Sequence, residues 1–203
     1  MTTLVLVRHG ATAWNDNRYC QGRKDVALSA RGRAQAKLLG AALRAFEFDR
    51  ILCSPLSRAI ETLRIAGYEG ETVPDLVEID RGHWEGHAME EVRRRWGRLC
   101  RRWYEDPRGL TLPGGEAFDA FWERAGGVWD RLRTDPAGPR LVAGHKATNR
   151  ALLARALGRL PPEVWGISQP QAGLSVLVRA GEGWRADRLG DVSHLPPEYR
   201  ADS

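Results

Sequence analysis

Cysteines and long apolar runs are scarce in this chain, and their scarcity excludes several classes of protein. The three cysteines, Cys20, Cys53 and Cys100, are odd in number and have no close spacing. The sequence therefore predicts neither a disulfide framework nor a zinc knuckle, and it favours a reducing, cytoplasmic location. No run approaches the roughly 18 apolar residues that a membrane span needs. The apolar run at residues 4–7 has no basic stretch before it, so we expect neither a signal peptide nor membrane association.

The overall composition is that of an ordinary globular protein. Of the 203 residues, 42% are hydrophobic and 28% are charged, and no internal repeat, low-complexity tract or linker is visible. We expect a single domain over residues 1–203. The net charge of +5 favours anionic partners, but it does not choose between phosphorylated metabolites, nucleic acid and a membrane surface.

Strand and helix patterns alternate along the chain, which favours a layered α/β fold. The run Leu4 to Val7 is typical of a strand buried on both faces, as in the centre of a parallel sheet. Further strands are expected at 50–53 and 141–143, an extended piece at 74–79 and a hairpin of 174–178 with 184–189. The helices are expected at 31–46, 57–66 and 147–157.

Two amphipathic segments interrupt this alternation. Residues 89–104 and 116–132 carry apolar side chains at spacings of three and four, and a segment rich in glycine and proline separates them. We expect a helical cap inserted at about 86–135. The arginines and tryptophans of 93–103 also suit nucleic acid, but helical spacing makes a solvated cap helix the preferred interpretation, so no nucleic-acid partner is expected.

Ionisable residues follow three of the predicted strands. These are Arg8-His9-Gly10, the segment from Ser54 to Arg58, and Gly144-His145-Lys146. Ligands bind beyond the carboxyl ends of strands in parallel α/β sheets, so these segments can meet in one pocket. Two arginines and two histidines in one pocket suit a phosphoryl group.

The segment 6–15, Leu-Val-Arg-His-Gly-Ala-Thr-Ala-Trp-Asn, resembles the signature of the histidine phosphatase superfamily, whose fold is phosphoglycerate-mutase-like. Blocks at 21–35, 54–62, 78–86 and 144–145 follow in the order of that family, so the resemblance covers about residues 3–180. It implies a three-layer α/β/α sandwich with a mostly parallel central sheet and a small helical cap. The block from Gly144 to Arg150 is similar to the broad-specificity or cobalamin-pathway phosphatase branch.

The same resemblance implies roles for individual residues. His9 is the expected nucleophile, because a neutral imidazole forms an intermediate that is itself a good leaving group. The remaining assignments are Arg8, Arg58 and His145 for the phosphoryl oxygens, Asn15, Gln21 and Gly22 as neutral donors, and Glu78 as the proton donor and acceptor. No metal and no cofactor is implied.

Three positions keep a second interpretation. Glu78 can instead complement the dipole of a helix start. Lys146, where many family members have a small residue, either extends the positive pocket or is solvated. His83 and His87 alternate with Glu85 as metal ligands sometimes do, but on an irregular turn this spacing is more often incidental.

The sequence thus predicts a metal-independent phosphomonoesterase, a phosphatase of the histidine acid type, acting on a small-molecule substrate. Two other functions stay open. A cofactor-dependent phosphoglycerate mutase would use the same phosphohistidine, and a non-catalytic module would keep only the phosphate pocket. A homodimer is possible by analogy with the family.

Overall fold

A six-stranded sheet forms the centre of the molecule. The computed structural model describes residues 2–136 and 138–200. The sheet has the order β3-β2-β4-β1-β5-β6, in which β3, β2, β4 and β1 are parallel, while β5 is antiparallel to both β1 and β6. Its strands are β1 (Thr3–Arg8), β2 (Arg50–Cys53), β3 (Glu71–Thr72), β4 (Arg140–Gly144), β5 (Leu174–Ala180) and β6 (Gly183–Asp191).

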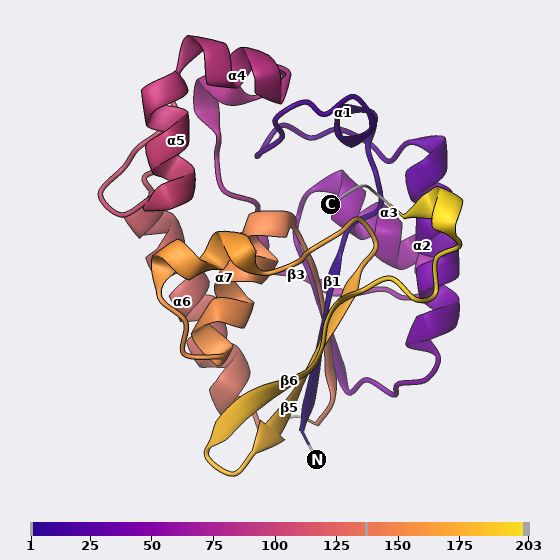
Figure 1. Cartoon of the computed structure of the whole chain (residues 1–203). Helices are drawn as coiled ribbons and strands as arrows, with labels where there is room; N and C mark the ends of the chain where they lie inside the picture. Colours follow the sequence, from indigo (N-terminus) through magenta and orange to yellow (C-terminus); the bar gives the residue numbers. More distant parts are fainter. Residues whose placement is uncertain (1, 137, 201–203) are drawn as a thin grey trace.

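Helices cover both faces of this sheet (Figure 1). On one side lie α2 (Ala30–Leu43) and α3 (Ser57–Ala66), and on the other lie α6 (Phe118–Thr134) and α7 (Lys146–Ala156). The predicted three-layer α/β/α sandwich with a mostly parallel sheet is confirmed. No helix of the described residues is long and apolar enough to cross a bilayer.

The central strand β1 explains why two separate apolar cores form. Alternate residues of a strand face opposite sides of the sheet. Leu4 and Leu6 belong to the core beneath α6 and α7, whereas Val5 and Val7 belong to the core beneath α2 and α3. All four side chains are buried, as expected from an uninterrupted apolar run in a strand covered on both faces.

The region predicted as one helix at 89–104 is instead two, α4 (Met89–Arg95) and α5 (Gly97–Glu105). Trp96 lies between them with a non-helical backbone, and Gly97 follows, a residue with low helix propensity. The change of direction allows Val92 and Trp103 to be buried in the same core. The extended piece expected at 74–79 was also wrong in its first turn, because Pro74–Leu76 forms the 3-10 helix η1.

The helices of the expected insertion occupy two different places. The helix α6 packs against α7 in one layer of the sandwich, whereas α4 and α5 stand beyond the carboxyl ends of the parallel strands, opposite the short helix α1 (Ala13–Asp16) (Figure 1). Only α4 and α5 are therefore placed to cover what lies at the strand ends. The short helices η2 (Gly82–Trp84), η3 (Pro161–Gly166) and η4 (Pro197–Tyr199) complete the described elements.

Candidate active site

The ends of β1 and β4 bring two histidines together. The strands are parallel neighbours with Arg8 opposite Gly144, so the residues that follow, His9 and His145, emerge side by side. Their ring centroids are 5.2 Å apart. Arg58, in the first turn of α3, donates from Nε to both rings, to His9 Nε2 at 3.3 Å and to His145 Nδ1 at 3.2 Å. The predicted convergence of the three strand-end segments is thus present.

His9 is held in a tautomer that can attack. Its Nδ1 lies 2.7 Å from the carbonyl oxygen of Gly10, and because a carbonyl only accepts, Nδ1 carries the proton and Nε2 keeps its lone pair. Burial and the charges of Arg58 and Arg8 hold the pKa of His9 well below its usual range. The ring is therefore neutral at pH 7, and Nε2 is an uncharged nucleophile.

The backbone around His9 is fixed on both sides. The His9 N–H donates to the Gly144 carbonyl at 3.1 Å, and the Gly10 N–H donates to Thr62 Oγ1 at 3.0 Å. Gly10 and Gly32 lie in direct backbone contact, and a Cβ on Gly32 would collide with the backbone of Ala11. The nucleophile consequently has little freedom to move.

Arg58 is buried, and within the described residues its hydrogen bonds go to imidazoles and carbonyls rather than to a carboxylate. Its Nη1 donates to the Lys24 carbonyl at 2.9 Å and its Nη2 to the Gly22 carbonyl at 2.7 Å. Only 1% of the residue is exposed, and desolvation lowers the pKa of its guanidinium. The site holds an oriented positive charge beside the His9 ring. The Gly22 carbonyl holds Arg58 in place, and the role of Gly22 as a donor to the substrate stays a prediction.

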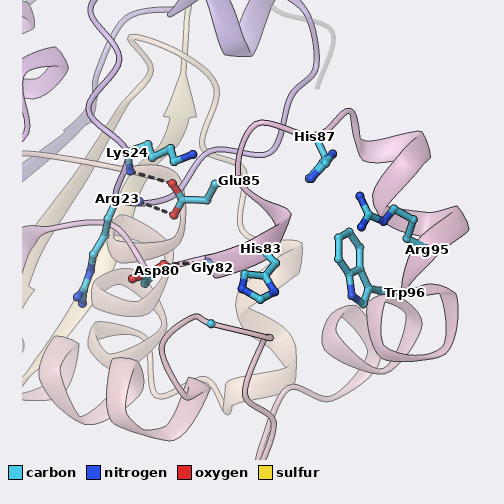
Figure 2. A pocket seen from close by; sticks show the side chains of 10 residues that line it. Arg23, Lys24, Asp80, Gly82, His83, Glu85, His87, Arg95 and Trp96 are labelled. Carbon is cyan, nitrogen blue, oxygen red and sulfur yellow. Dashed lines mark hydrogen bonds between the residues drawn. The ribbon is translucent and has the colours of Figure 1, made fainter.

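The loop that holds Arg58 is itself held by Glu85. The Glu85 carboxylate accepts from the backbone N–H groups of Arg23 and Lys24, both at 2.8 Å (Figure 2), and from that of Arg81 at 3.1 Å. Glu85 is 8% exposed. Figure 2 shows this carboxylate turned toward the loop from one wall of a neighbouring cavity of about 820 Å³. It thereby positions the carbonyl of Lys24 that Arg58 uses.

His83 and His87 line the same neighbouring cavity. Figure 2 shows His83 beside Gly82 and His87 apart from it, on the side of Arg95. His87 Nδ1 lies 3.0 Å from a carboxylate oxygen of Glu91. Within residues 2–136 and 138–200, no group of three potential metal ligands is gathered.

Arg8 and Gln21 line the site, and each has a buried side-chain donor without a partner among the described residues. Arg8 Nη1 donates to the Gln169 carbonyl at 2.8 Å, and burial lowers the pKa of Arg8 to about 9, so it is still charged at pH 7. Within the described part of the chain, Arg8 Nε and Gln21 Nε2 are buried and have no hydrogen-bond partner. Both residues line a pocket of about 590 Å³ that also contains His9 and Arg58. Buried donors without partners are uncommon in proteins, and an anion in this pocket would satisfy them.

Asn15 lines the same pocket and is oriented by Thr12. Its amide oxygen accepts from the Thr12 N–H at 3.1 Å. Thr12 Oγ1 in turn donates to the Gln21 amide oxygen at 2.9 Å. In both amides the oxygen is thus engaged, which leaves the NH2 groups to donate toward a ligand.

Glu78 lines the pocket and also caps α7. Its Oε2 accepts from the Ala147 N–H at 2.9 Å, while Oε1 accepts from the N–H groups of Ile79 at 2.9 Å and Thr148 at 3.2 Å. The helix-start interpretation made from the sequence is thus present in the structure, and the role of Glu78 in proton transfer stays a prediction. Because Oε2 has a single donor, it is the oxygen with a lone pair available for a proton.

His145 and Lys146 differ sharply in exposure. His145 is fully buried behind Arg58, with Nε2 2.6 Å from Ser54 Oγ, and burial together with the charge of Arg58 holds its pKa well below the usual range. Lys146 has an exposed side chain, but the surface it exposes forms part of the pocket wall. The same wall includes Arg81 and Tyr104. Sequence reasoning missed both, because Tyr104 lies outside the family blocks and Arg81, although inside the block at 78–86, is not one of the residues that match there.

Comparison with known proteins identifies the family. Residues 4–192 match the family model of the histidine phosphatase superfamily (branch 1). Phosphoserine phosphatase 1 from Hydrogenobacter thermophilus is 33% identical over 182 residues, which is 87% of this chain and 86% of that protein. A 2-carboxy-D-arabinitol-1-phosphatase from Triticum aestivum is 34% identical over 179 residues, or 86% of this chain, but the match spans only 36% of that longer protein.

A solved structure agrees with these sequence matches. The α-ribazole phosphatase of Shigella flexneri has a TM-score of 0.83 with this structure at 27% identity, covering 94% of this chain and 96% of that one. The shared fold, the family match over nearly the whole chain and the similarity to named phosphatases together show that this chain belongs to branch 1 of the histidine phosphatase superfamily.

Proposed function

We propose that the protein is a metal-independent phosphomonoesterase that hydrolyses small phosphorylated metabolites through a phosphohistidine on His9. The observation that carries this proposal is the neutral Nε2 of His9, fixed by the Gly10 carbonyl and placed beside the cationic Arg58. Relatives that act on a phosphorylated sugar acid and on phosphoserine, as their names state, support a small phosphomonoester as the substrate.

In the first step, His9 Nε2 attacks phosphorus, the N–P bond forms and the bond to the ester oxygen breaks. Arg8 and Arg58 stabilise the charge on the transferring phosphoryl group, with Asn15 and Gln21 as neutral donors. His145 accepts from Arg58 Nε and so acts on the phosphoryl group through the position of Arg58. The Nδ1–H bond to Gly10 persists, so the phosphohistidine carries a positive imidazolium, which is a good leaving group.

Glu78 handles the protons in this scheme. Its Oε2 gives a proton to the departing alcohol oxygen, and then takes one from the water that attacks the phosphohistidine. The second step breaks the N–P bond, releases inorganic phosphate and restores neutral His9. Proton transfer of this kind contributes a factor of roughly 10²–10⁴ to the rate.

The proposal is tested by phosphate release in the presence of EDTA. We expect turnover of p-nitrophenyl phosphate to survive chelation, and rapid quenching with ³²P-labelled substrate to trap a protein-bound phosphate that is stable in alkali and labile in acid. Loss of activity in EDTA that zinc or magnesium restores would contradict the metal-independent mechanism. Interconversion of 2- and 3-phosphoglycerate that is faster than their hydrolysis would favour a mutase instead. If no phosphomonoester is turned over, a non-catalytic phosphate-binding module would be favoured.

Glu85 should act as a positioning residue for Arg58. Glu85→Gln replaces a carboxylate that accepts three backbone N–H groups with an amide that has one acceptor oxygen and presents a donor to the rest. We expect kcat/KM for p-nitrophenyl phosphate to fall about tenfold, the equivalent of one charge-assisted hydrogen bond.

Orthovanadate provides a second measurement for Glu85→Gln, because its affinity depends on Arg58 but on no leaving group. A similar fall in vanadate affinity is expected. Glu91→Gln, which alters the exposed pair with Arg95, is the control and should change neither quantity. A destabilised Glu85→Gln protein with unchanged kcat/KM and vanadate affinity would show that Glu85 is merely structural.

A further inference from the structure

The pocket that contains His9 has far more positive charge than one phosphoryl group requires. Among the described residues that line it, six are cationic and one, Glu78, is a carboxylate. The six are Arg8, Arg18, Arg58, Arg81, Arg93 and Lys146. Arg8 and Arg58 adjoin the nucleophile and suffice to balance a phosphoryl dianion. The volume of about 590 Å³ also leaves room for a leaving group several atoms long.

Three of these cations have no carboxylate partner. Within the described ranges, no carboxylate lies at ion-pair distance from Arg81, Arg93 or Lys146. Many arginines elsewhere are paired, such as Arg95 with Glu91 at 3.3 Å and Arg124 with Glu116 at 2.9 Å. Unpaired cations on one pocket wall repel one another, and an anionic ligand removes that repulsion.

Arg81 is already oriented for such a ligand. Its guanidinium lies 5.9 Å from the ring centroids of both Trp103 and Trp165. Its Nη1 donates to the Tyr104 hydroxyl at 3.5 Å. These contacts restrict the side chain while leaving further N–H groups for an oxyanion, whose two oxygens fit the guanidinium fork.

Lys146 experiences the same excess of positive charge. Partial desolvation and the charges of Arg8, Arg150 and Arg81 lower the pKa of Lys146 to about 7. An anion bound beside it would offset that repulsion and keep the ammonium protonated. Lys146 directly follows His145 at the start of α7, so it stands at the border between the nucleophile and the rest of the pocket.

We propose that this enzyme selects phosphomonoesters whose alcohol carries a second anionic group, bound by Lys146 and Arg81, and no ammonium group. A carboxylate and a second phosphate are the two sources of this charge. An ammonium group on the alcohol would face Lys146 and Arg81, and Glu78 is the one carboxylate among the described residues of the pocket. This inference rests on the proposed function, since it names the substrate class of the same site.

The test compares three-carbon esters that differ in one group. The reference substrate is 3-phosphoglycerate. In glycerol 3-phosphate CH2OH replaces its carboxylate, in phosphoserine an ammonium replaces its 2-hydroxyl, and in glycerol 1,3-bisphosphate a phosphorylated CH2OH replaces its carboxylate. We expect kcat/KM for 3-phosphoglycerate to exceed that for glycerol 3-phosphate by about tenfold or more, and phosphoserine to fall between them. A higher kcat/KM for the bisphosphate than for 3-phosphoglycerate would assign the subsite to a second phosphate.

Variants then assign the selectivity to residues. Lys146→Met and Arg81→Met should each lower the ratio of kcat/KM for 3-phosphoglycerate to that for glycerol 3-phosphate by about tenfold. Arg95→Met removes the same charge from α4, and its guanidinium instead lies over the Trp96 ring at 4.7 Å. This control should leave the ratio as in the wild type.

The outcomes separate this inference from the function on which it rests. Equal kcat/KM for 3-phosphoglycerate and glycerol 3-phosphate in an active wild type would overturn the inference and leave the phosphatase intact. An unchanged ratio in both Lys146→Met and Arg81→Met would overturn the assignment to these residues. If no ester is hydrolysed, including p-nitrophenyl phosphate, the proposed function itself fails and the inference falls with it.

Discussion

Replacing His9 by alanine is expected to lower kcat for p-nitrophenyl phosphate by about 10⁴-fold or more, as removal of a covalent nucleophile does in other enzymes. No other described side chain offers a neutral nitrogen lone pair at this place. His145 is fully buried and, unlike His9, is not among the described residues that line the pocket, and its Nε2 contacts Ser54 Oγ. Steady-state assays should therefore show nearly complete loss, and the acid-labile phosphoprotein should be absent.

The control for this result is His83→Ala, which removes an exposed histidine of the neighbouring cavity. We expect it to retain wild-type kcat and kcat/KM. Circular dichroism and the thermal unfolding midpoint should show that both variants are folded. If His9→Ala keeps more than about one hundredth of the wild-type kcat, a water molecule rather than His9 attacks phosphorus, and the phosphohistidine mechanism is wrong.

The second large effect is expected at Arg58. Arg58→Met should lower kcat/KM by roughly 10²–10³-fold, the usual effect of removing one donor that stabilises transition-state charge. Arg58→Lys restores the charge, but an ammonium cannot contact the Gly22 and Lys24 carbonyls and the two imidazoles in the geometry of the guanidinium. We expect it to stay at least about tenfold below the wild type.

The loss of Arg58 also leaves the Gly22 and Lys24 carbonyls without their donor. The effect of the substitution on stability therefore has to be measured separately from its effect on catalysis. Activity and orthovanadate affinity are measured well below the unfolding midpoint of each variant. Arg64→Met, an exposed position on the same helix, should match the wild type. Wild-type vanadate affinity in a folded Arg58→Met protein would contradict a role for Arg58 in binding the phosphoryl group.

The position of the candidate site could be predicted from the sequence because sheet geometry is strict. Parallel strands end at one edge, so polar residues that follow β1, β2 and β4 must come near one another. Arg8, His9, Arg58 and His145 meet for that reason. The uninterrupted apolar run of β1 was sufficient to place it at the centre of the sheet.

The contacts that hold the site residues in place were not predictable from the sequence in the same way. Glu85 reaches the 23–24 loop across 61 residues of sequence, and Arg81 is oriented by Trp103 and Trp165 from separate elements. Such contacts depend on how loops and helices pack in three dimensions, and no local periodicity records them. Gly22 is a further example, since the resemblance implied a donor to the ligand and did not indicate that the Gly22 carbonyl also accepts from Arg58.

Helix ends and short elements were also beyond the sequence pattern. The spacing of apolar residues in 89–104 continues through the break at Trp96, because both helices bury one side in the same core and periodicity alone does not detect a change of axis. The strand β3 has two residues, too few for any alternation to appear.

The separation between strand ends and cap has an evolutionary consequence. The groups that would hold the phosphoryl group come from the sheet edge and are tied to backbone atoms, whereas α4 and α5 contribute Met89, Arg93 and Tyr104 to the far side of the pocket. A mutation on these two helices can alter which alcohol is accepted without moving His9 or Arg58. Proteins that evolve from this chain can therefore acquire new substrates through mutations in α4 and α5, while selection preserves the residues at the sheet edge and the chemical step that they perform.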